Sequence, residues 1–334
     1  MNNGKRRYKD WPSENKFYCG GRIITGPDSK YFYATASSII APGIVFLAGV
    51  AFELIREIKY GWVLVVIMLF LWIQTIVLFF STSFSDPGIL PRAPPPKELE
   101  ESPFSWEDKR PPVTRDYKCN GVKVTEKYCD TCHIYRPPRA SHCPVCNNCV
   151  LRFDHHCPWV GNCIGQRNYR RFFIFSWSAT TLIITVFGFC VTDLVVRVLM
   201  NKNDNGMGTG RAIGETLKNP TSAALGIYCF CILWPVLSLC SFHSYLVTTG
   251  YTTREKCSPL HAGKKNPFAK GCCYNWIYIC CPPNFPSHIK PTEYIGTGAD
   301  SDIENGTSKK SSSHKPNISS AQSTGNIESD VADD

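Results

Sequence analysis

Residues that commonly bind metal are concentrated in one short stretch of this 334-residue chain. Seven cysteines and four histidines lie within the 35 residues from Cys129 to Cys163. Zinc takes four tetrahedral thiolate or imidazole ligands, and a Cys-x2-Cys pair supplies two of them from one tight turn. Six of the cysteines and two of the histidines make eight ligands, so the stretch predicts two closed Cys3His zinc sites. The alternative is a cluster of buried or oxidised thiols.

After eight ligands are assigned, the metals do not need one cysteine and one histidine that lie close together, with an aspartate beside them. They belong to the consecutive residues Asp154, His155, His156 and Cys157. A closed zinc site has no open position for a substrate, so the chemistry must lie outside the metals. A free cysteine beside a histidine and a carboxylate is the usual arrangement of an activated nucleophile, in which the carboxylate fixes the imidazole tautomer.

The competing interpretation is a membrane-anchored zinc-binding scaffold without catalytic activity, for instance a RING-like adaptor. A RING domain needs a terminal Cys-x2-Cys pair after the histidines. Here the cluster ends with the single Cys163, which argues against a RING domain.

Four apolar stretches must position this cluster at a membrane. They run from about Tyr31 to Phe52, Trp62 to Phe80, Phe172 to Thr192 and Ser222 to Val247. Roughly 20 apolar residues are enough to cross a ~30 Å hydrocarbon core. Each stretch alone could be a buried helix of a large soluble core, but four of this length favour transmembrane helices. The 13% aromatic content also excludes an intrinsically disordered chain.

The distribution of Lys and Arg predicts the orientation of these helices. The segments before the first, between the second and third, and after the fourth hold 7, 14 and 9 of them, whereas the other two loops hold 2 and 4. The positive-inside rule therefore places both ends and the cysteine-rich loop in the cytosol, where thiols stay reduced and bind metal. The net charge of +9 is then a membrane feature, and no nucleic-acid partner is expected.

The expected fold is an α-helical polytopic membrane protein with four transmembrane helices and a cytosolic two-zinc domain between helices two and three. Its segments are a cytosolic N-terminal segment (1–30), helices one and two (31–82), a cytosolic loop (83–171, zinc core 127–164), helices three and four (172–248), a cytosolic C-terminal segment (249–298) and an acidic tail (299–334). We expect the tail to be disordered. Its sequons at Asn305 and Asn317 stay unglycosylated if the tail is cytosolic.

Several motifs in the same order resemble those of the DHHC-cysteine-rich-domain protein S-acyltransferases. The resemblance rests on the run from Arg136 to Cys143, followed by the run from Arg152 to Cys163 with Asp154-His155-His156-Cys157 inside it. Three flanking motifs are similar to the family's DPG, TTxE and Asn-Pro-aromatic motifs: Ser85-Asp86-Pro87-Gly88, Thr252-Thr253-Arg254-Glu255 and Asn266-Pro267-Phe268. The resemblance covers roughly residues 15–285.

The resemblance implies a role for each residue of the cysteine-rich stretch. Two structural zinc ions would be held by interleaved ligand sets, Cys129, Cys132, His142 and Cys149 for one, and Cys143, Cys146, His156 and Cys163 for the other. It implies that Cys157 is the nucleophile, His155 the base and Asp154 the residue that orients the base. It also suggests that Thr253 supports Asp154.

The implied activity is transfer of a palmitoyl group from palmitoyl-CoA to cysteine thiols of membrane-associated proteins. Four arginines around the motif are candidates for contact with the CoA phosphates: Arg152, Arg167, Arg170 and Arg171. We also assign Trp159 to the mouth of the acyl site. The alternative is that the arginines anchor the third helix at the membrane surface and that Trp159 is an interfacial aromatic residue.

Two cysteine pairs follow the Asn-Pro-Phe segment, Cys272-Cys273 and Cys280-Cys281, and these thiols are candidates for acylation. Similar pairs occur in the family's Ras-palmitoyltransferase-like subgroup, which acts with a small accessory subunit. The resemblance therefore implies Ras-like GTPases as substrates, an accessory subunit, and a location in endomembranes, in the Golgi or endoplasmic reticulum or at the plasma membrane.

Overall fold

The computed structural model describes residues 5–94, 112–119, 122–203, 206–258, 266 and 268–295. Within them, four helical segments are long and apolar enough to cross a membrane: α1 (Ser29–Gly49) with α2 (Ala51–Glu57), α3 (Gly61–Ser83), α4 (Tyr169–Asn203) and α6 (Thr221–Thr249). This confirms the four predicted transmembrane helices. The predicted acidic tail with its sequons, and Pro267 of the Asn-Pro-Phe segment, lie outside the described residues.

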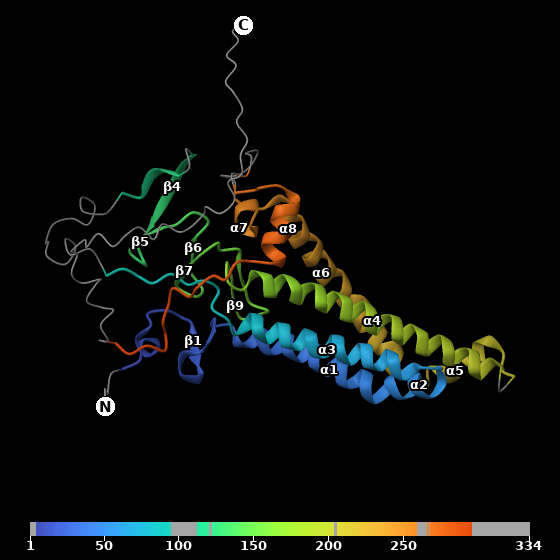
Figure 1. The fold of residues 1–334 in the computed structure, drawn as a ribbon. Helices are drawn as coiled ribbons and strands as arrows, with labels where there is room; N and C mark the ends of the chain where they lie inside the picture. The colour runs from blue at the N-terminus through green and yellow to red at the C-terminus, as the bar shows by residue number, and fades with distance from the viewer. Residues whose placement is uncertain are drawn as a thin grey trace, which may run out of the picture.

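The four long helices form one elongated bundle (Figure 1). The short helix α5 (Thr209–Thr216) and α2 lie at one end of it, and all the small strands lie at the opposite end (Figure 1). The described N-terminal and C-terminal segments meet at the strand end, because Arg6 and Tyr294 form an antiparallel bridge. The cysteine-rich region is therefore placed at one end of the bundle, between the second and third spans, as predicted.

Helix α4 runs well beyond the predicted end of the third span at Thr192, as far as Asn203. Two charged residues, Asp193 and Arg197, follow that end. In the structure Asp193 is 2% exposed and accepts a hydrogen bond from the Ser222 hydroxyl at 2.6 Å, and Arg197 pairs with it at 3.3 Å. Buried charges are tolerated when they are paired and hydrogen-bonded, so the helix continues through them.

Specific polar contacts accompany the apolar packing of the bundle. Pro42 lies inside α1 and has no N–H, which deprives the Ser38 carbonyl of its helical partner. The Tyr228 hydroxyl of α6 donates to that carbonyl at 2.9 Å. The core contains buried side chains from every span, among them Phe46, Leu54, Met68, Leu182, Val186 and Leu225.

The cysteine-rich region is built from short antiparallel strands. They form one three-stranded sheet and two hairpins: β3 (Thr114–Cys119), β4 (Val122–Cys129) and β5 (Ile134–Arg136), then β6 (Ser141–Cys143) with β7 (Asn148–Val150), and β8 (His155–Cys157) with β9 (Asn162–Ile164). A further hairpin, β1 (Lys16–Tyr18) with β2 (Ile23–Thr25), precedes α1. The 3-10 turn η1 (Arg7–Asp10) comes before it, and the 3-10 turn η2 (Cys19–Gly21) connects its two strands. Two short helices follow α6, namely α7 (Thr253–Lys256) and α8 (Cys272–Cys280).

Hairpins of three residues cannot bury enough apolar surface to be stable alone. Metal ligands and contacts with the bundle must therefore hold this region in place.

The segment after α3 joins the bundle to the cysteine-rich region. Asp86 accepts hydrogen bonds from the backbone N–H groups of Gly88 and Ile89 at 2.8 and 2.9 Å, and its second oxygen pairs with Arg167, just before α4. The Ser287 hydroxyl, from the C-terminal segment, donates to that same oxygen at 2.6 Å. The Ser85–Gly88 motif is thus the point where three distant parts of the chain meet.

Asn162, at the start of β9, makes a second joint of this kind. Its side chain is fully buried and its Nδ2 donates to the carbonyls of Ser83 and Ser85, each at 2.9 Å. Its Oδ1 accepts from the Cys163 N–H at 2.8 Å. One side chain therefore satisfies backbone groups at the end of α3 and within the hairpin.

Replacing this side chain should loosen the joint. In Asn162→Ala the two carbonyls and the Cys163 N–H lose a partner, and each buried group left unsatisfied costs about 1–3 kcal/mol. We expect the melting temperature of the purified protein to fall by several degrees, measured by thermal unfolding in detergent. Asn284→Ala, at an exposed position, is the control and should melt like the wild type. An unchanged melting temperature in Asn162→Ala would show that the hydrogen bonds of the Asn162 side chain do not stabilise the protein.

Candidate active site and zinc centres

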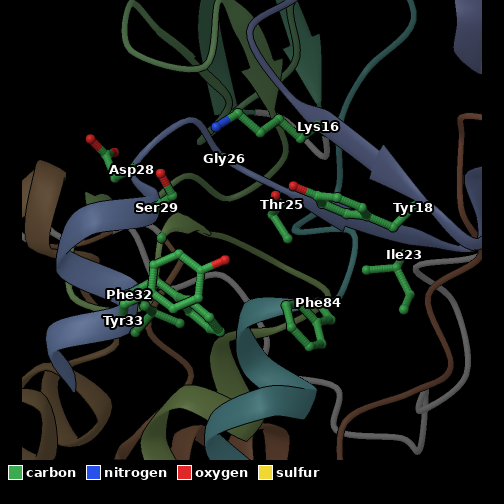
Figure 2. A pocket seen from close by; sticks show the side chains of 12 residues that line it. Lys16, Tyr18, Ile23, Thr25, Gly26, Asp28, Ser29, Phe32, Tyr33 and Phe84 are labelled. Atoms are coloured by element: carbon green, nitrogen blue, oxygen red, sulfur yellow. The ribbon is translucent and has the colours of Figure 1, made fainter. Parts of the chain in front are cut away.

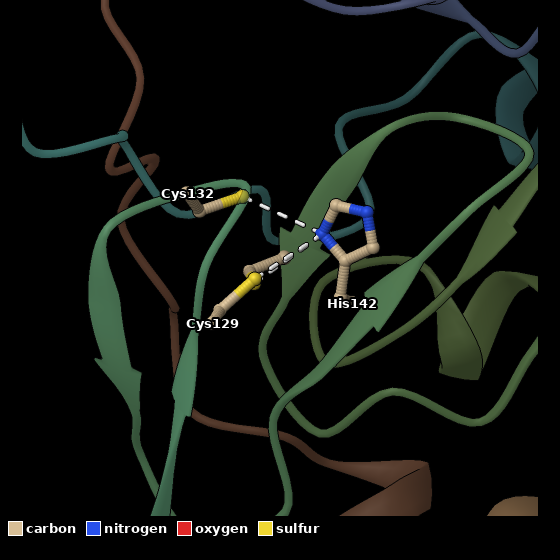
Figure 3. A group of neighbouring side chains, drawn as sticks. Cys129, Cys132 and His142 are labelled. Atoms are coloured by element: carbon tan, nitrogen blue, oxygen red, sulfur yellow. Dashed lines mark hydrogen bonds between the residues drawn. The ribbon is translucent and has the colours of Figure 1, made fainter. Parts of the chain in front are cut away.

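The first group of metal-binding side chains combines residues from three strands and a turn. Cys129 ends β4, Cys132 follows in the turn, His142 lies on β6 and Cys149 lies on β7. The Nδ1 atom of His142 is 3.6 Å from the Cys129 sulfur, 3.5 Å from that of Cys132 and 3.8 Å from that of Cys149. Figure 3 shows the imidazole pointing between the two sulfurs of the Cys-x2-Cys turn.

The second group has the same composition. The Nδ1 atom of His156 lies 3.4 Å from the Cys146 sulfur and 3.5 Å from the Cys163 sulfur, and those two sulfurs are 3.5 Å apart. Cys143 completes the set, whose four donor atoms all lie within 4.8 Å of one another. The structure thus assembles the two ligand sets that the resemblance implied.

These spacings fit zinc. With Zn–S bonds of about 2.3 Å and Zn–N bonds of about 2.05 Å, the edges of a tetrahedral Cys3His site are roughly 3.6 Å between nitrogen and sulfur and roughly 3.8 Å between sulfurs. The donor separations of both groups lie close to those edges. Both sites have four protein ligands, so a zinc ion there supplies structure and leaves no open position for a substrate.

Strand geometry explains why neighbouring ligands serve different sites. Successive side chains of a β-strand point to opposite faces. On β6, His142 therefore faces the first group and Cys143 the second. On β8, His156 faces the second group, while His155 and Cys157, two residues apart, share the other face.

Asp28, just before α1, orients one of the metal-binding histidines. Its carboxylate is 2.5 Å from His156 Nε2, the ring nitrogen that does not face the thiols. A carboxylate that accepts this N–H fixes the tautomer and makes the opposite nitrogen a better ligand. Sequence reasoning missed this residue, because 128 positions separate it from His156.

Asp154 is the most heavily hydrogen-bonded side chain of the candidate active site. It is 1% exposed, and its Oδ2 accepts from His155 Nδ1 and from the Thr253 hydroxyl, each at 2.7 Å. Its Oδ1 accepts from the Thr253 backbone N–H at 2.9 Å. Burial opposes ionisation, but the hydrogen bonds and the charge of His155 keep the pKa of Asp154 below its ordinary value.

His155 lies between the aspartate and the thiol. Burial disfavours the charged ring, yet hydrogen bonds to Asp154 and to Cys157 raise the pKa of His155 to about 10. The ring therefore carries a proton at neutral pH. Cys157 itself is 7% exposed and packs with Val160, Ile164 and Phe172. The structure thus brings Asp154, His155, Cys157 and Thr253 together at the start of α4.

A buried ion pair holds the segment after α6 against this site. Arg139 donates to the two carboxylate oxygens of Glu255 at 2.7 and 2.6 Å and to the Gly250 carbonyl at 2.8 Å. Glu255 also closes a capping box with Thr252 at the start of α7. The Thr-x-x-Glu pattern is a recognisable capping signal in the sequence, but its partner Arg139 is 116 positions away.

The four arginines considered for CoA contact fall into two pairs. The Arg152 guanidinium lies over the rings of Tyr169 and Tyr278, at 5.1 and 5.6 Å, and burial lowers its pKa. Arg167 pairs with Asp86 and donates to the Phe285 carbonyl at 2.9 Å. Both are thus engaged within the protein. In contrast, the other two are exposed in the first turn of α4: Arg170 and Arg171.

Trp159 is 59% exposed and packs edge-on against Tyr31 of α1, with ring centroids 5.5 Å apart. The next residue, Val160, packs in the Cys157 cluster and also lines a cavity of about 230 Å³. That cavity lies between the β1–β2 hairpin and the start of α1, with Phe32, Tyr33 and Phe84 on one side and Lys16 and Tyr18 on the other (Figure 2). The loop after Cys157 thus reaches the junction with α1.

A family model and the similar proteins of known name agree on one family. Residues 122–259 match the family described as DHHC palmitoyltransferase. The chain is 38% identical to Protein S-acyltransferase 8 of Arabidopsis thaliana, over 86% of this chain and 71% of that protein. It is 41% identical to Probable protein S-acyltransferase 5 of the same plant and 36% identical to Palmitoyltransferase ZDHHC14 of Homo sapiens. The chain spans 58% and 60% of the lengths of those two relatives.

The metal sites lead to a direct prediction. We expect close to two zinc ions per purified chain by elemental analysis. Asp28→Ala should lose one of them about 10- to 100-fold more readily to a chelator, because His156 loses the carboxylate that orients it. Asp10→Ala, which removes an exposed carboxylate paired with Lys5, should behave as the wild type. A ratio near zero or one in the wild type, or equal chelator resistance in Asp28→Ala, would contradict the assignment.

Proposed function

The chain belongs to the DHHC palmitoyltransferase family, and we propose that it moves a long-chain fatty acyl group from acyl-CoA to protein cysteine thiols through an acyl-enzyme on Cys157. The observation that carries the proposal is the placement of His155 between the buried Asp154 carboxylate and the Cys157 thiol. Neither metal site needs these three side chains. A scaffold without catalytic activity would have no use for them.

The first step forms the acyl-enzyme. A protonated imidazole beside a thiol stabilises the thiolate, which is the nucleophilic form of cysteine. The Cys157 sulfur attacks the thioester carbonyl of acyl-CoA, a new carbon–sulfur bond forms, and the bond to CoA breaks. The departing CoA thiolate takes the proton from His155, which becomes neutral.

The second step returns the site to its starting state. A substrate thiol gives its proton to the neutral His155 and its sulfur attacks the carbonyl on Cys157. The Cys157 thiolate leaves beside the imidazolium. One thioester replaces another in both steps, so the transfer needs no other energy source. Asp154 and Thr253 keep the imidazole in the tautomer that presents a nitrogen to the thiol.

The position of Cys157 suits an acyl donor with one apolar and one charged end. The thiol packs against Phe172 and Phe173 in the first turns of α4, so an attached chain can continue along the bundle. At ~0.8 kcal/mol per CH2, burying a palmitoyl chain contributes on the order of 10 kcal/mol. Arg170 and Arg171 are exposed at the same end and can meet the CoA phosphates in water.

The excess of Lys and Arg supports a cytosolic zinc domain and cytosolic termini, where acyl-CoA and substrate thiols would both be accessible. We propose endomembranes, in the Golgi or endoplasmic reticulum, as the location. Ras-like GTPases as substrates and a small accessory subunit rest on the resemblance of the paired cysteines alone. Those cysteines, on and next to α8, are exposed and able to accept acyl groups themselves: Cys272, Cys273, Cys280 and Cys281.

A single substitution tests the mechanism. Purified protein incubated with labelled palmitoyl-CoA should form a hydroxylamine-sensitive adduct and pass the label to a thiol acceptor. Cys157→Ser should lower both by at least a hundredfold, because the nucleophilic thiolate is lost. The matched control, Cys272→Ser with Cys273→Ser, removes two exposed thiols and should leave transfer intact. Undiminished adduct and transfer in Cys157→Ser would overturn the mechanism.

A further inference from the structure

A histidine in the fourth span is unexplained by the metals and by the proposed reaction. Among the histidines that the structure describes, His243 is the one that lies within a spanning helix, on α6. It is 1% exposed. An ionisable side chain in a membrane span is costly, and such residues face the bundle interior and mark functional sites. Specific contacts must therefore compensate for the burial of the His243 ring.

Two residues of α4 surround the His243 ring. The Tyr169 hydroxyl and His243 Nδ1 are hydrogen-bonded at 3.1 Å. The Phe172 ring meets the imidazole edge to face, with centroids 4.9 Å apart. Tyr169 is itself held, since the Arg152 guanidinium lies over its ring. The orientation of His243 is thus determined by packing and by one hydrogen bond.

His243 also reaches the residues that flank the nucleophile. Its ring centroid is 5.8 Å from that of His155, and the rings are inclined by 40°. A ring nitrogen of His243 lies within 4.8 Å of both a His155 nitrogen and an Asp154 oxygen. Phe172 touches His155 as well, at 5.3 Å between centroids. The imidazole of His155 is therefore enclosed by one aromatic ring from α4 and one from α6.

The two rings restrict a tilt of the His155 imidazole that the hydrogen bond to Asp154 alone does not restrict. The hydrogen bond from His155 Nδ1 to Asp154 fixes one side of the ring and does not by itself stop the imidazole from tilting about that bond. A tilt moves the opposite nitrogen away from the Cys157 sulfur, and a displacement of about 1 Å at a reacting group can cost 100-fold in rate. Contacts on the ring face prevent the tilt.

We propose that His243, held by Tyr169, is a positioning residue that keeps the His155 imidazole aligned with Cys157. The inference rests on the proposed roles of Cys157 and His155. It gives the fourth span a part in the chemistry, because α6 contributes no side chain to the nucleophile, the base or the metal sites. It also explains why a polar ring occupies a position where leucine would pack at lower cost.

Full-length protein in nanodiscs with palmitoyl-CoA tests this inference. In His243→Leu the rate of acyl-enzyme formation at saturating palmitoyl-CoA should fall about 10- to 100-fold, while the KM for palmitoyl-CoA stays within about twofold. His243→Asn keeps a polar group at the position of Nδ1 and a partner for Tyr169, so it should recover most of the rate. Tyr169→Phe removes that partner and should resemble His243→Leu in direction.

The matched control is Cys240→Ala. Cys240 and Thr180 form another buried polar contact between α6 and α4, 3.0 Å long, about one turn from His243. This variant should keep the wild-type rate. An unchanged rate in His243→Leu, an Asn variant as slow as the Leu variant, or slow variants that also lose zinc or melt early would overturn the inference. The wild-type protein distinguishes this inference from the proposed function. If the wild-type adduct does not form on Cys157, the proposed function is contradicted, whatever the His243 variants do.

Discussion

The active site depends on a buried carboxylate that no single part of the chain can satisfy. Asp154 lies in the zinc domain, yet two of its three hydrogen bonds come from Thr253, 99 residues later. A charged group without partners in a buried position would cost several kcal/mol. The zinc domain and the segment after α6 must therefore be docked before Asp154 can be ionised and His155 oriented. The Arg139–Glu255 pair, which is itself buried, holds that docked arrangement.

Zinc and the membrane helices supply the rigidity that the small strands lack. The three-residue hairpins would not be stable alone, but each is bounded by ligands whose spacing suits a metal. Asp86 and Asn162 fasten the same region to the end of α3. Cys157, the proposed nucleophile on β8, is therefore positioned by the two metal-ligand sets, by the end of α3, by the start of α4 and by the segment after α6. That degree of constraint is what a thiol, an imidazole and a carboxylate need to act as a unit.

Local sequence patterns predicted much of this arrangement. Composition predicts the spans and Cys-x2-Cys spacing predicts metal. The separate roles of His155 and His156 came from the family resemblance, and the alternation of side chains on β8 explains them. The residues that sequence reasoning missed act over long separations: Asp28 on His156, Arg139 on Glu255, and His243 on His155. No local pattern pairs residues a hundred positions apart. Helix α4 continues past the predicted end of the third span, because the buried Asp193 is held by partners that include the distant Ser222.

The central claim is that the segment after α6 activates the zinc domain through Asp154, and a substitution at Thr253 tests it most directly. Thr253→Val keeps the size of the side chain and the backbone donor but removes the hydroxyl that donates to Asp154. A hydrogen bond to a charged group contributes about 1.5–3 kcal/mol. The account predicts that acyl-enzyme formation slows about 10- to 100-fold in Thr253→Val, with zinc content unchanged, and that Thr253→Ser stays near the wild-type rate. A wild-type rate in Thr253→Val would contradict it.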